Sequence, residues 1–314
     1  MRTARRLALA LIALALIAAV LIFFPFWRSP PAVALQGDPE RGAYVLRMGG
    51  CVSCHTPRGE EGAMLAGGRP LATPFGTIYS SNITPDPETG IGGWSAGDFV
   101  LAMTVGVSPG GHHYFPAFPY TSYTRMTEQD LVDLKAHLDT VEPVRNPVPA
   151  PEMGFPYNLR PLLGGWKLLF LEAGTFEPDP ERSEAWNRGA YLVNGPTHCG
   201  ECHTPRNALG GKRQAHFLAG NRDGPDGDSV PNITPHPEDG IGRWSKGDLT
   251  FALLTGILPD GDVFGGAMGE VVRESTGHLS QDDLDAIAEY LLSLPPLPDA
   301  EPRPPAADGN AGSG

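Results

Sequence analysis

The chain has 314 residues, of which 41% are hydrophobic and 19% charged, a composition typical of a globular protein rather than a disordered one. Its net charge of −13 argues against nucleic acid as a partner, because nucleic-acid-binding surfaces are rich in Lys and Arg. The 40 glycines and 33 prolines indicate long irregular loops. A chain of this length is sufficient for two domains of ordinary size.

The N-terminus has the features of a targeting element. Basic residues within Met1 to Arg6 precede an uncharged run from Leu7 to Trp27, which predicts an uncleaved single-pass helix in the inner membrane. Arginines before the run and aromatic residues near its far end predict that residues 1–36 comprise a cytoplasmic stub and anchor, with the bulk of the chain in the periplasm. The alternative is a signal peptide cleaved at Ala32-Val33-Ala34, which leaves a soluble periplasmic protein.

An internal duplication sets the domain count. Residues 41–46 read Arg-Gly-Ala-Tyr-Val-Leu, and residues 188–193 repeat them as Arg-Gly-Ala-Tyr-Leu-Val. Each copy predicts a short helix whose apolar side chains pack against a later helix of the same half. We therefore expect one domain over residues 37–146 and a second over residues 183–297.

Each copy continues into a Cys-x-x-Cys-His motif. Two thiols three residues apart, with an imidazole directly after the second, have the spacing at which a c-type haem is covalently attached. The thiols form thioethers to the porphyrin and the histidine ligates the iron. The two motifs use all four cysteines, which predicts two haem c groups held by Cys51, Cys54 and His55 and by Cys199, Cys202 and His203. A single zinc site is the alternative, disfavoured because each cysteine pair has its own histidine and repeat.

Residues after each motif are candidates to contact the haem propionates. Arg58 and Arg206 follow the two motifs in a repeated Thr-Pro-Arg and either neutralise propionates or lie in solvent. Trp94 and Trp244 end a repeated segment that begins Asn-Ile-Thr-Pro. Each indole either donates to a propionate or packs in the core.

Capping patterns predict two further helices in each half. Ser95 and Ser245 are each followed three residues later by Asp, which fits a capping box at a helix start. The last helices start at Thr127 and Ser280, again with an acidic residue three positions on. No segment shows a strong alternating pattern of strands, which indicates an all-α fold.

A six-coordinate haem requires a second axial ligand, and methionine gives the higher potential expected of an electron acceptor. Met268 is the only methionine after the second motif, and we expect it to ligate the second iron. In the first half the aligned residue is Phe118, which cannot bind iron, so Met126 is the predicted ligand. His112 and His113 are the alternative and would give a bis-histidine haem of lower potential.

The region between the two halves, residues 147–182, is a proline-containing linker. It encloses residues 159–171, which are too few and too polar to span a membrane. We expect a packed interdomain segment, with a patch for a partner or a membrane surface as the alternative. The tail, residues 298–314, is rich in Pro, Ala, Gly and Asp and is predicted to be disordered.

These motifs resemble the diheme cytochrome c proteins related to the cytochrome subunits of membrane-bound alcohol and gluconate dehydrogenases. The resemblance covers about residues 38–297 and rests on the duplicated CxxCHTPR, the duplicated Asn-Ile-Thr-Pro with Gly-Ile-Gly-x-Trp, and the aromatic segment 114–120. It implies an all-α fold of two tandem class I cytochrome c domains, which would follow the N-terminal transmembrane helix expected from residues 1–36. Phe118 is typical of the subgroup that takes its ligand from a later Tyr-x-x-Met-Thr, here residues 123–127.

The expected function is single-electron transfer from a dehydrogenase or quinol to a soluble cytochrome or terminal oxidase, with no catalytic residue. The haem performs the redox chemistry, and the protein tunes potential and docking. The alternative is a diheme enzyme, either a peroxidase or a thiosulfate dehydrogenase. Because a peroxidase needs an iron with an open or displaceable ligand, the sixth ligand of the first haem separates the two hypotheses.

Overall fold

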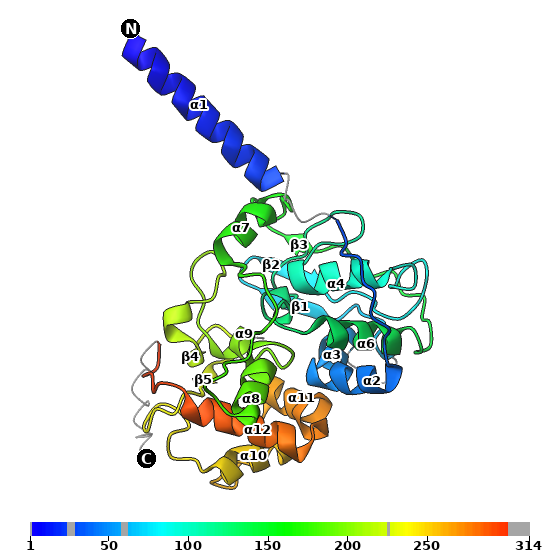
Figure 1. Cartoon of the computed structure of the whole chain (residues 1–314), viewed down its shortest axis with the longest axis vertical. Coiled ribbons are helices and arrows are strands. Elements are labelled where there is room, and N and C mark those ends of the chain that lie inside the picture. Colours follow the sequence, from blue (N-terminus) through cyan, green and yellow to red (C-terminus); the bar gives the residue numbers. More distant parts are fainter. Residues whose placement is uncertain (1, 24–28, 58–61, 225–226, 301–314) are drawn as a thin grey trace, which may run out of the picture. The chain divides into compact units, whose positions relative to one another are not determined.

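The computed structural model describes residues 2–23, 29–57, 62–224 and 227–300 (Figure 1). The chain divides into two compact units, Met1–Glu177 and Pro178–Gly314. The division falls inside the predicted linker, while the predicted limits of the two domains stay a prediction. Arg58 and residues 301–314 of the predicted tail lie outside the described residues.

Helices form most of the regular structure in both units. Unit 1 contains α1 (Arg2–Phe23), α2 (Pro39–Met48), α3 (Cys51–His55), α4 (Ala96–Val105), α5 (Tyr120–Tyr123), α6 (Glu128–Leu138) and α7 (Leu162–Phe170). Unit 2 contains α8 (Glu184–Asn194), α9 (Gly200–His203), α10 (Lys246–Thr255), α11 (Gly266–Glu274) and α12 (Gln281–Ser293), with 3-10 turns η1 (Gln214–His216) and η3 (Thr276–His278). The predicted helix starts are confirmed, because Ser95, Thr127, Ser245 and Ser280 are the N-caps of α4, α6, α10 and α12.

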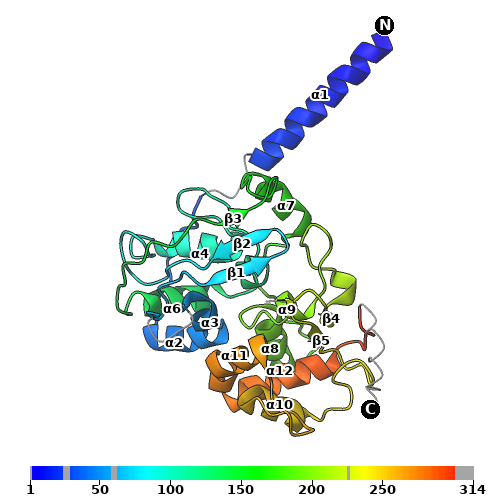
Figure 2. The ribbon, with the colours of Figure 1, turned by 180° about the vertical axis from the view of Figure 1, so that it is seen from behind.

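The all-α prediction is wrong, because each unit also contains a small antiparallel sheet (Figure 2). Unit 1 pairs β1 (Pro70–Thr73), β2 (Gly76–Tyr79) and β3 (Glu152–Met153) in that order, and unit 2 pairs β4 (Ala219–Asn221) with β5 (Val230–Asn232). These strands are too short to show an alternating pattern. At Gly76, φ is +137° and a Cβ would collide with the Glu152 carbonyl, so glycine permits the pairing of β2 with β3.

The predicted transmembrane helix is also wrong. Within the described ranges, no helix combines the length and the apolar character that crossing a bilayer requires. The segment is helical as α1, but Arg2, Arg5 and Arg6 occupy its first turns. The uncharged part of α1 is therefore residues 7–23, short of the ~20 apolar residues of a typical span. Residues 24–28 of the predicted span lie outside the described residues.

The predicted packing of each first duplicated helix against a later helix is confirmed, and that later helix is the last one of its half. In unit 1, α2 packs against α6, and in unit 2, α8 packs against α12. Gly42 and Gly189 lie at these crossings, where a Cβ would overlap the backbone carbonyl of Asp133 or Ala286. The two glycines therefore let each pair of helix backbones approach closely.

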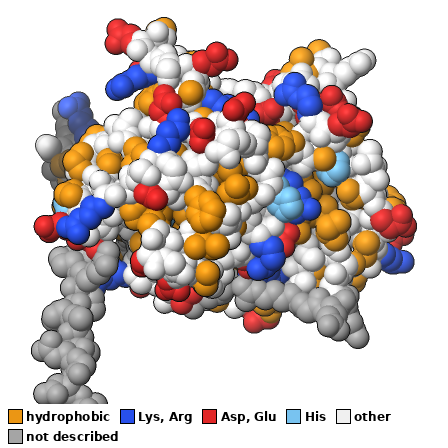
Figure 3. Space-filling view, turned by 90° about the horizontal axis from the view of Figure 1, so that it is seen from below, with side chains coloured by type: hydrophobic (Ala, Val, Ile, Leu, Met, Phe, Trp, Pro, Cys, Tyr) orange, Lys and Arg blue, Asp and Glu red, His pale blue; other side chains and the backbone are white. Residues whose placement is uncertain are grey.

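Apolar side chains remain exposed in both units. On the face shown in Figure 3 they are interspersed with charged side chains. In unit 1, α7 lies within the predicted linker segment. Its Lys167 side chain is buried, whereas its Leu169 side chain is 70% exposed. In unit 2, Phe251 of α10 and Val263 before α11 are exposed. Helix α7 thus packs with one face only.

Candidate functional site

The two Cys-x-x-Cys-His motifs fold as single helical turns. Residues three apart on a helix lie on the same face, so α3, and α9 with its N-cap Cys199 in helical conformation, bring the two thiols of each motif together. None of these four cysteines forms a disulfide. Burial raises the pKa of Cys51 to about 12 and also raises that of Cys199. Burial therefore disfavours the thiolate at both positions, which suits neutral sulfur atoms such as those of thioethers.

The motif histidines are held in the same way in both units. Nδ1 of His55 lies 2.7 Å from the carbonyl oxygen of Ser81, and Nδ1 of His203 lies 2.7 Å from that of Pro231. Each carbonyl accepts the Nδ1 proton, which leaves Nε2 for the metal, as is usual for metal-ligating histidines. Burial lowers the pKa of both rings and so favours the neutral imidazole that binds iron.

The small sheets supply these carbonyls. Ser81 follows β2 closely, and Pro231 is the central residue of β5. The strands that the sequence did not predict therefore orient the histidines that it did predict. The duplicated thiol pairs and oriented imidazoles fit two covalent haem groups.

The alternative of a zinc site requires several metal-ligating side chains close together. Within the described ranges, no group of three or more His, Cys, Asp and Glu side chains is arranged to hold a metal ion. The two cysteine pairs lie in separate units.

The two predicted sulfur ligands differ in their surroundings. Met126 is 1% exposed and lies between α5 and α6. Met268 is partly buried in the first turn of α11, whose N-cap is Gly265. Ligation by either residue stays a prediction.

Phe118, which aligns with Met268, belongs to an aromatic cluster. Its ring packs edge-on against the rings of Tyr114, Tyr120 and Tyr123, at centroid distances of 5.6, 6.3 and 5.8 Å. Such contacts stabilise the segment before α5. The cluster gives Phe118 a packing role that methionine would not reproduce.

The alternative ligand His113 is engaged elsewhere in unit 1. Its side chain is buried, and its Nδ1 lies 2.9 Å from Nζ of Lys167 on α7. The same Nζ donates to the carbonyl oxygen of Gly106 at 2.7 Å and lies 4.7 Å from the ring centre of Tyr120. Arg160 donates to the His113 carbonyl at 3.0 Å. These contacts attach α7 to the loop that contains His113.

Lys167 is expected to make the stability of the protein depend on pH. Its side chain is fully buried, and burial lowers its pKa from 10.5 to about 7. Between these values the unfolded chain binds the proton and the folded chain does not, so the free energy of unfolding rises with pH. At 1.36 kcal/mol per pKa unit, the rise is on the order of 5 kcal/mol.

Denaturant unfolding at several pH values, followed by circular dichroism, measures this dependence. The Lys167→Met variant is expected to lose the rise between about pH 7 and pH 10. Lys246→Met is the matched control, because the Lys246 side chain is 47% exposed rather than buried. Equal pH slopes for the wild type and Lys167→Met would contradict the assignment.

The residues predicted to contact propionates differ in their burial and in their hydrogen-bond partners. Trp94 and Trp244 are half-buried, and their backbone N–H groups donate to Ile91 and Ile241. The Arg206 guanidinium instead pairs with Glu201, at 2.6 Å, and donates to its carbonyl. Lys212 also pairs with Glu201, which lies between the two cysteines of the second motif. The propionate role of Trp94, Trp244 and Arg206 stays a prediction.

Two arginines that sequence reasoning missed lie beside the histidine-orienting hairpins. Arg69 precedes β1 and is 8% exposed, and Arg222 follows β4 with its Nη2 buried. The available signal was the duplicated Leu-Ala-Gly-x-Arg at residues 65–69 and 218–222. The orphaned guanidinium nitrogen of Arg222 further fits a site built for an anionic group.

Several known proteins are similar in sequence to most of this chain. No family model matches the chain. A diheme cytochrome c-type protein of Cereibacter sphaeroides is 42% identical over 306 residues, covering 95% of this chain and 100% of the relative. The alcohol dehydrogenase (quinone) cytochrome c subunit of Gluconacetobacter polyoxogenes is 42% identical over 270 residues, covering 83% of this chain and 57% of that subunit. A nicotinate dehydrogenase subunit of Pseudomonas putida is 46% identical over 275 residues, which is 87% of this chain but 23% of that protein.

The resemblance drawn from the motifs is therefore confirmed. The Cereibacter relative is covered in full, whereas the chain spans just over half of the alcohol dehydrogenase subunit. Cytochrome subunits of fructose and gluconate dehydrogenases are 40% and 41% identical over most of this chain. The chain belongs to the family of diheme c-type cytochromes, electron-transfer proteins with two covalently bound haem c groups.

Proposed function

We propose that this cytochrome transfers single electrons from a dehydrogenase or a quinol to a respiratory acceptor, either a soluble cytochrome or a terminal oxidase. The haem groups supply the redox chemistry, in which each iron changes its charge by one. Support for a dehydrogenase donor comes from relatives named as cytochrome c subunits of alcohol, fructose and gluconate dehydrogenases. The chemical class of the donor's own substrate differs among these relatives.

The repeated histidine geometry is the observation that carries the proposal. Nδ1 of His55 and of His203 is held by a backbone carbonyl at the same distance of 2.7 Å in both units. A ring fixed in this way moves little when the charge on its metal changes, which suits a carrier. The buried Met126, in the same unit as His55, suits a closed coordination sphere in the first domain.

We propose that both haem domains work on the periplasmic side of the membrane. The basic and apolar N-terminal sequence supports export, and bacteria attach c-type haem in that compartment. Protease added to spheroplasts tests the location. Digestion of the haem-stained band supports the periplasm, and full protection of that band in intact spheroplasts would contradict it.

Spectroscopy of the purified diheme protein tests the carrier proposal. Reduced-minus-oxidised spectra are expected to show two low-spin haems per chain and no spectral change with carbon monoxide, because a histidine and a methionine would hold each iron. Reduction by a partner dehydrogenase with its substrate should then proceed without added mediators. Substantial peroxide turnover by the protein alone would instead indicate the diheme peroxidase.

A further inference from the structure

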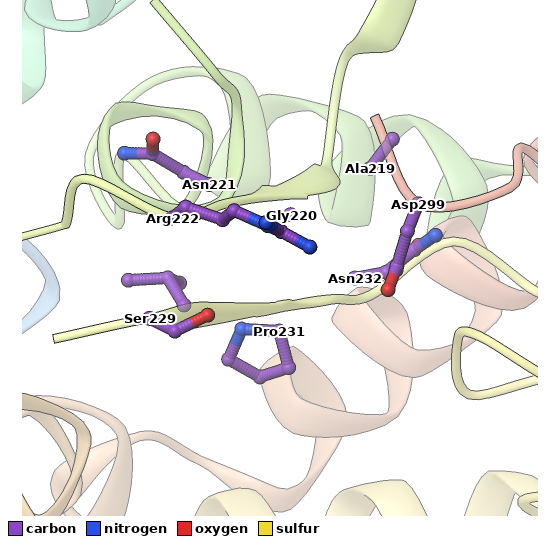
Figure 4. A pocket seen from close by; sticks show the side chains of 9 residues that line it. Ala219, Gly220, Asn221, Arg222, Ser229, Pro231, Asn232 and Asp299 are labelled. Carbon is purple, nitrogen blue, oxygen red and sulfur yellow. The ribbon is translucent and has the colours of Figure 1, made fainter. Parts of the chain in front are cut away.

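Arg222 extends into a pocket of about 290 Å³ between β4 and β5, in unit 2 (Figure 4). Its Nη2 is buried and has no hydrogen-bond partner. A buried cationic donor without an acceptor is unfavourable, so this position calls for an anion. Pro231, which gives its carbonyl to the ring of His203, lines the same pocket. The unpaired guanidinium nitrogen therefore belongs to the same pocket as the residue that orients the second iron ligand.

The same arginine recurs in unit 1. Arg69 follows Leu65 by four residues, as Arg222 follows Leu218, and both leucines have the left-handed φ of 62°. Arg69 is 8% exposed, and its Nη1 donates to the carbonyl oxygen of Ser53. Ser53 lies between the two cysteines of the first motif. The duplicated arginines are thus placed by the same backbone turn beside the two attachment sites.

A haem c carries two carboxylates, its propionates, and they are the anions that a diheme chain must accommodate. Guanidinium groups bind carboxylates through paired hydrogen bonds and keep their charge at all working pH values. Arg206, the arginine expected from the sequence for the second haem, is already paired with Glu201.

We propose that Arg222 binds a propionate of the second haem and that Arg69 binds one of the first. The proposal rests on the two haems and is independent of the donor and the acceptor. A fixed positive charge beside a haem favours the reduced state, because reduction adds a negative charge nearby. Each arginine therefore raises the reduction potential of its own haem.

Asp299 also lines the pocket and is the rival acceptor for Arg222. In Figure 4 the Arg222 side chain extends along the pocket toward the end where Asp299 and Asn232 lie. Arg222 Nη2 makes no hydrogen bond to this carboxylate. If Asp299 were the only partner, removing either residue would change stability and leave both haem potentials as they are.

Redox titration of the holoprotein tests the proposal. Arg222→Met is expected to lower one of the two potentials by about 59 mV, a tenfold change in the ratio of reduced to oxidised haem, and to leave the other unchanged. Arg69→Met should lower the other potential. Arg222→Lys keeps the charge and should restore most of the shift.

Arg182→Met is the matched control, since Arg182 is 55% exposed in unit 2 and its loss removes the same charge. It is expected to change neither potential, and Asp299→Asn should not lower either. Unchanged potentials in Arg222→Met, or an equal fall in Arg182→Met, would overturn the assignment. If Arg222→Met does not retain its second haem, Arg222→Gln and Arg222→Lys decide: the proposal requires a lowered potential in the first and a near-native one in the second.

Discussion

Replacing Met268 with alanine is expected to remove half of the near-infrared magnetic circular dichroism that arises from methionine-to-iron charge transfer. Met268 is the only methionine after the second motif, and it lies in the first turn of α11. Met126→Ala should remove the other half, because Met126 is fully buried just before α6. Loss of the thioether also lowers the potential of the affected haem. The double variant is expected to show no methionine signal and to bind carbon monoxide at both irons.

Met103→Ala provides the control for this experiment. Met103 is 6% exposed within α4, so its truncation removes similar buried volume. The variant should lose stability and keep the whole charge-transfer signal. A full signal in Met126→Ala would mean that the first iron takes its ligand elsewhere. A wild-type spectrum with one bis-histidine haem would transfer the role to His112 or His113.

The helix starts were predictable because capping is local. Ser95 and Ser245 with their aspartates form the expected capping boxes, within four consecutive residues each. The sheets were not predictable in the same way. Strand β3 is two residues long and pairs with β2, from which it is separated by more than seventy residues in the sequence. No local sequence pattern therefore predicts it. The uncharged run of residues 7–27 predicted a span by its length, whereas α1 ends at Phe23 and includes the arginines that precede this run.

The functional site likewise has parts that the sequence predicted and parts that it did not. Each haem attachment motif is contiguous and can therefore be recognised in the sequence. The relatives confirm the two haems that these motifs predicted. Arg206 looked available because its partner Glu201 can be identified only when the turn between them is known. Arg222 was overlooked because its burial comes from the pairing of β4 with β5. Chemistry encoded within five residues was predicted, and chemistry that depends on tertiary pairing was not.

Substituting alanine for Gly189 is expected to destabilise the second domain by about 3 kcal/mol or more. The new Cβ would overlap the backbone carbonyl of Ala286 in α12. Overpacking a well-packed interface typically costs ~1–3 kcal/mol, and a helix carbonyl cannot move aside as a flexible side chain can. Gly42→Ala should do the same to the first domain, where the Cβ meets the carbonyl of Asp133. Denaturant unfolding of the holoprotein, followed by circular dichroism, measures both changes.

Two other glycines separate this steric effect from the general effect of replacing glycine. A Cβ at Gly93 would meet nothing within 4 Å, and one at Gly247 would meet only the Ser245 hydroxyl at 3.8 Å. Gly247 lies in α10, where alanine is the better helix former, so Gly247→Ala should be neutral or slightly stabilising. Equal destabilisation in all four variants would refute close helix approach as the reason for Gly42 and Gly189. A loss confined to those two would show that each haem domain depends on the contact between its first and last duplicated helices.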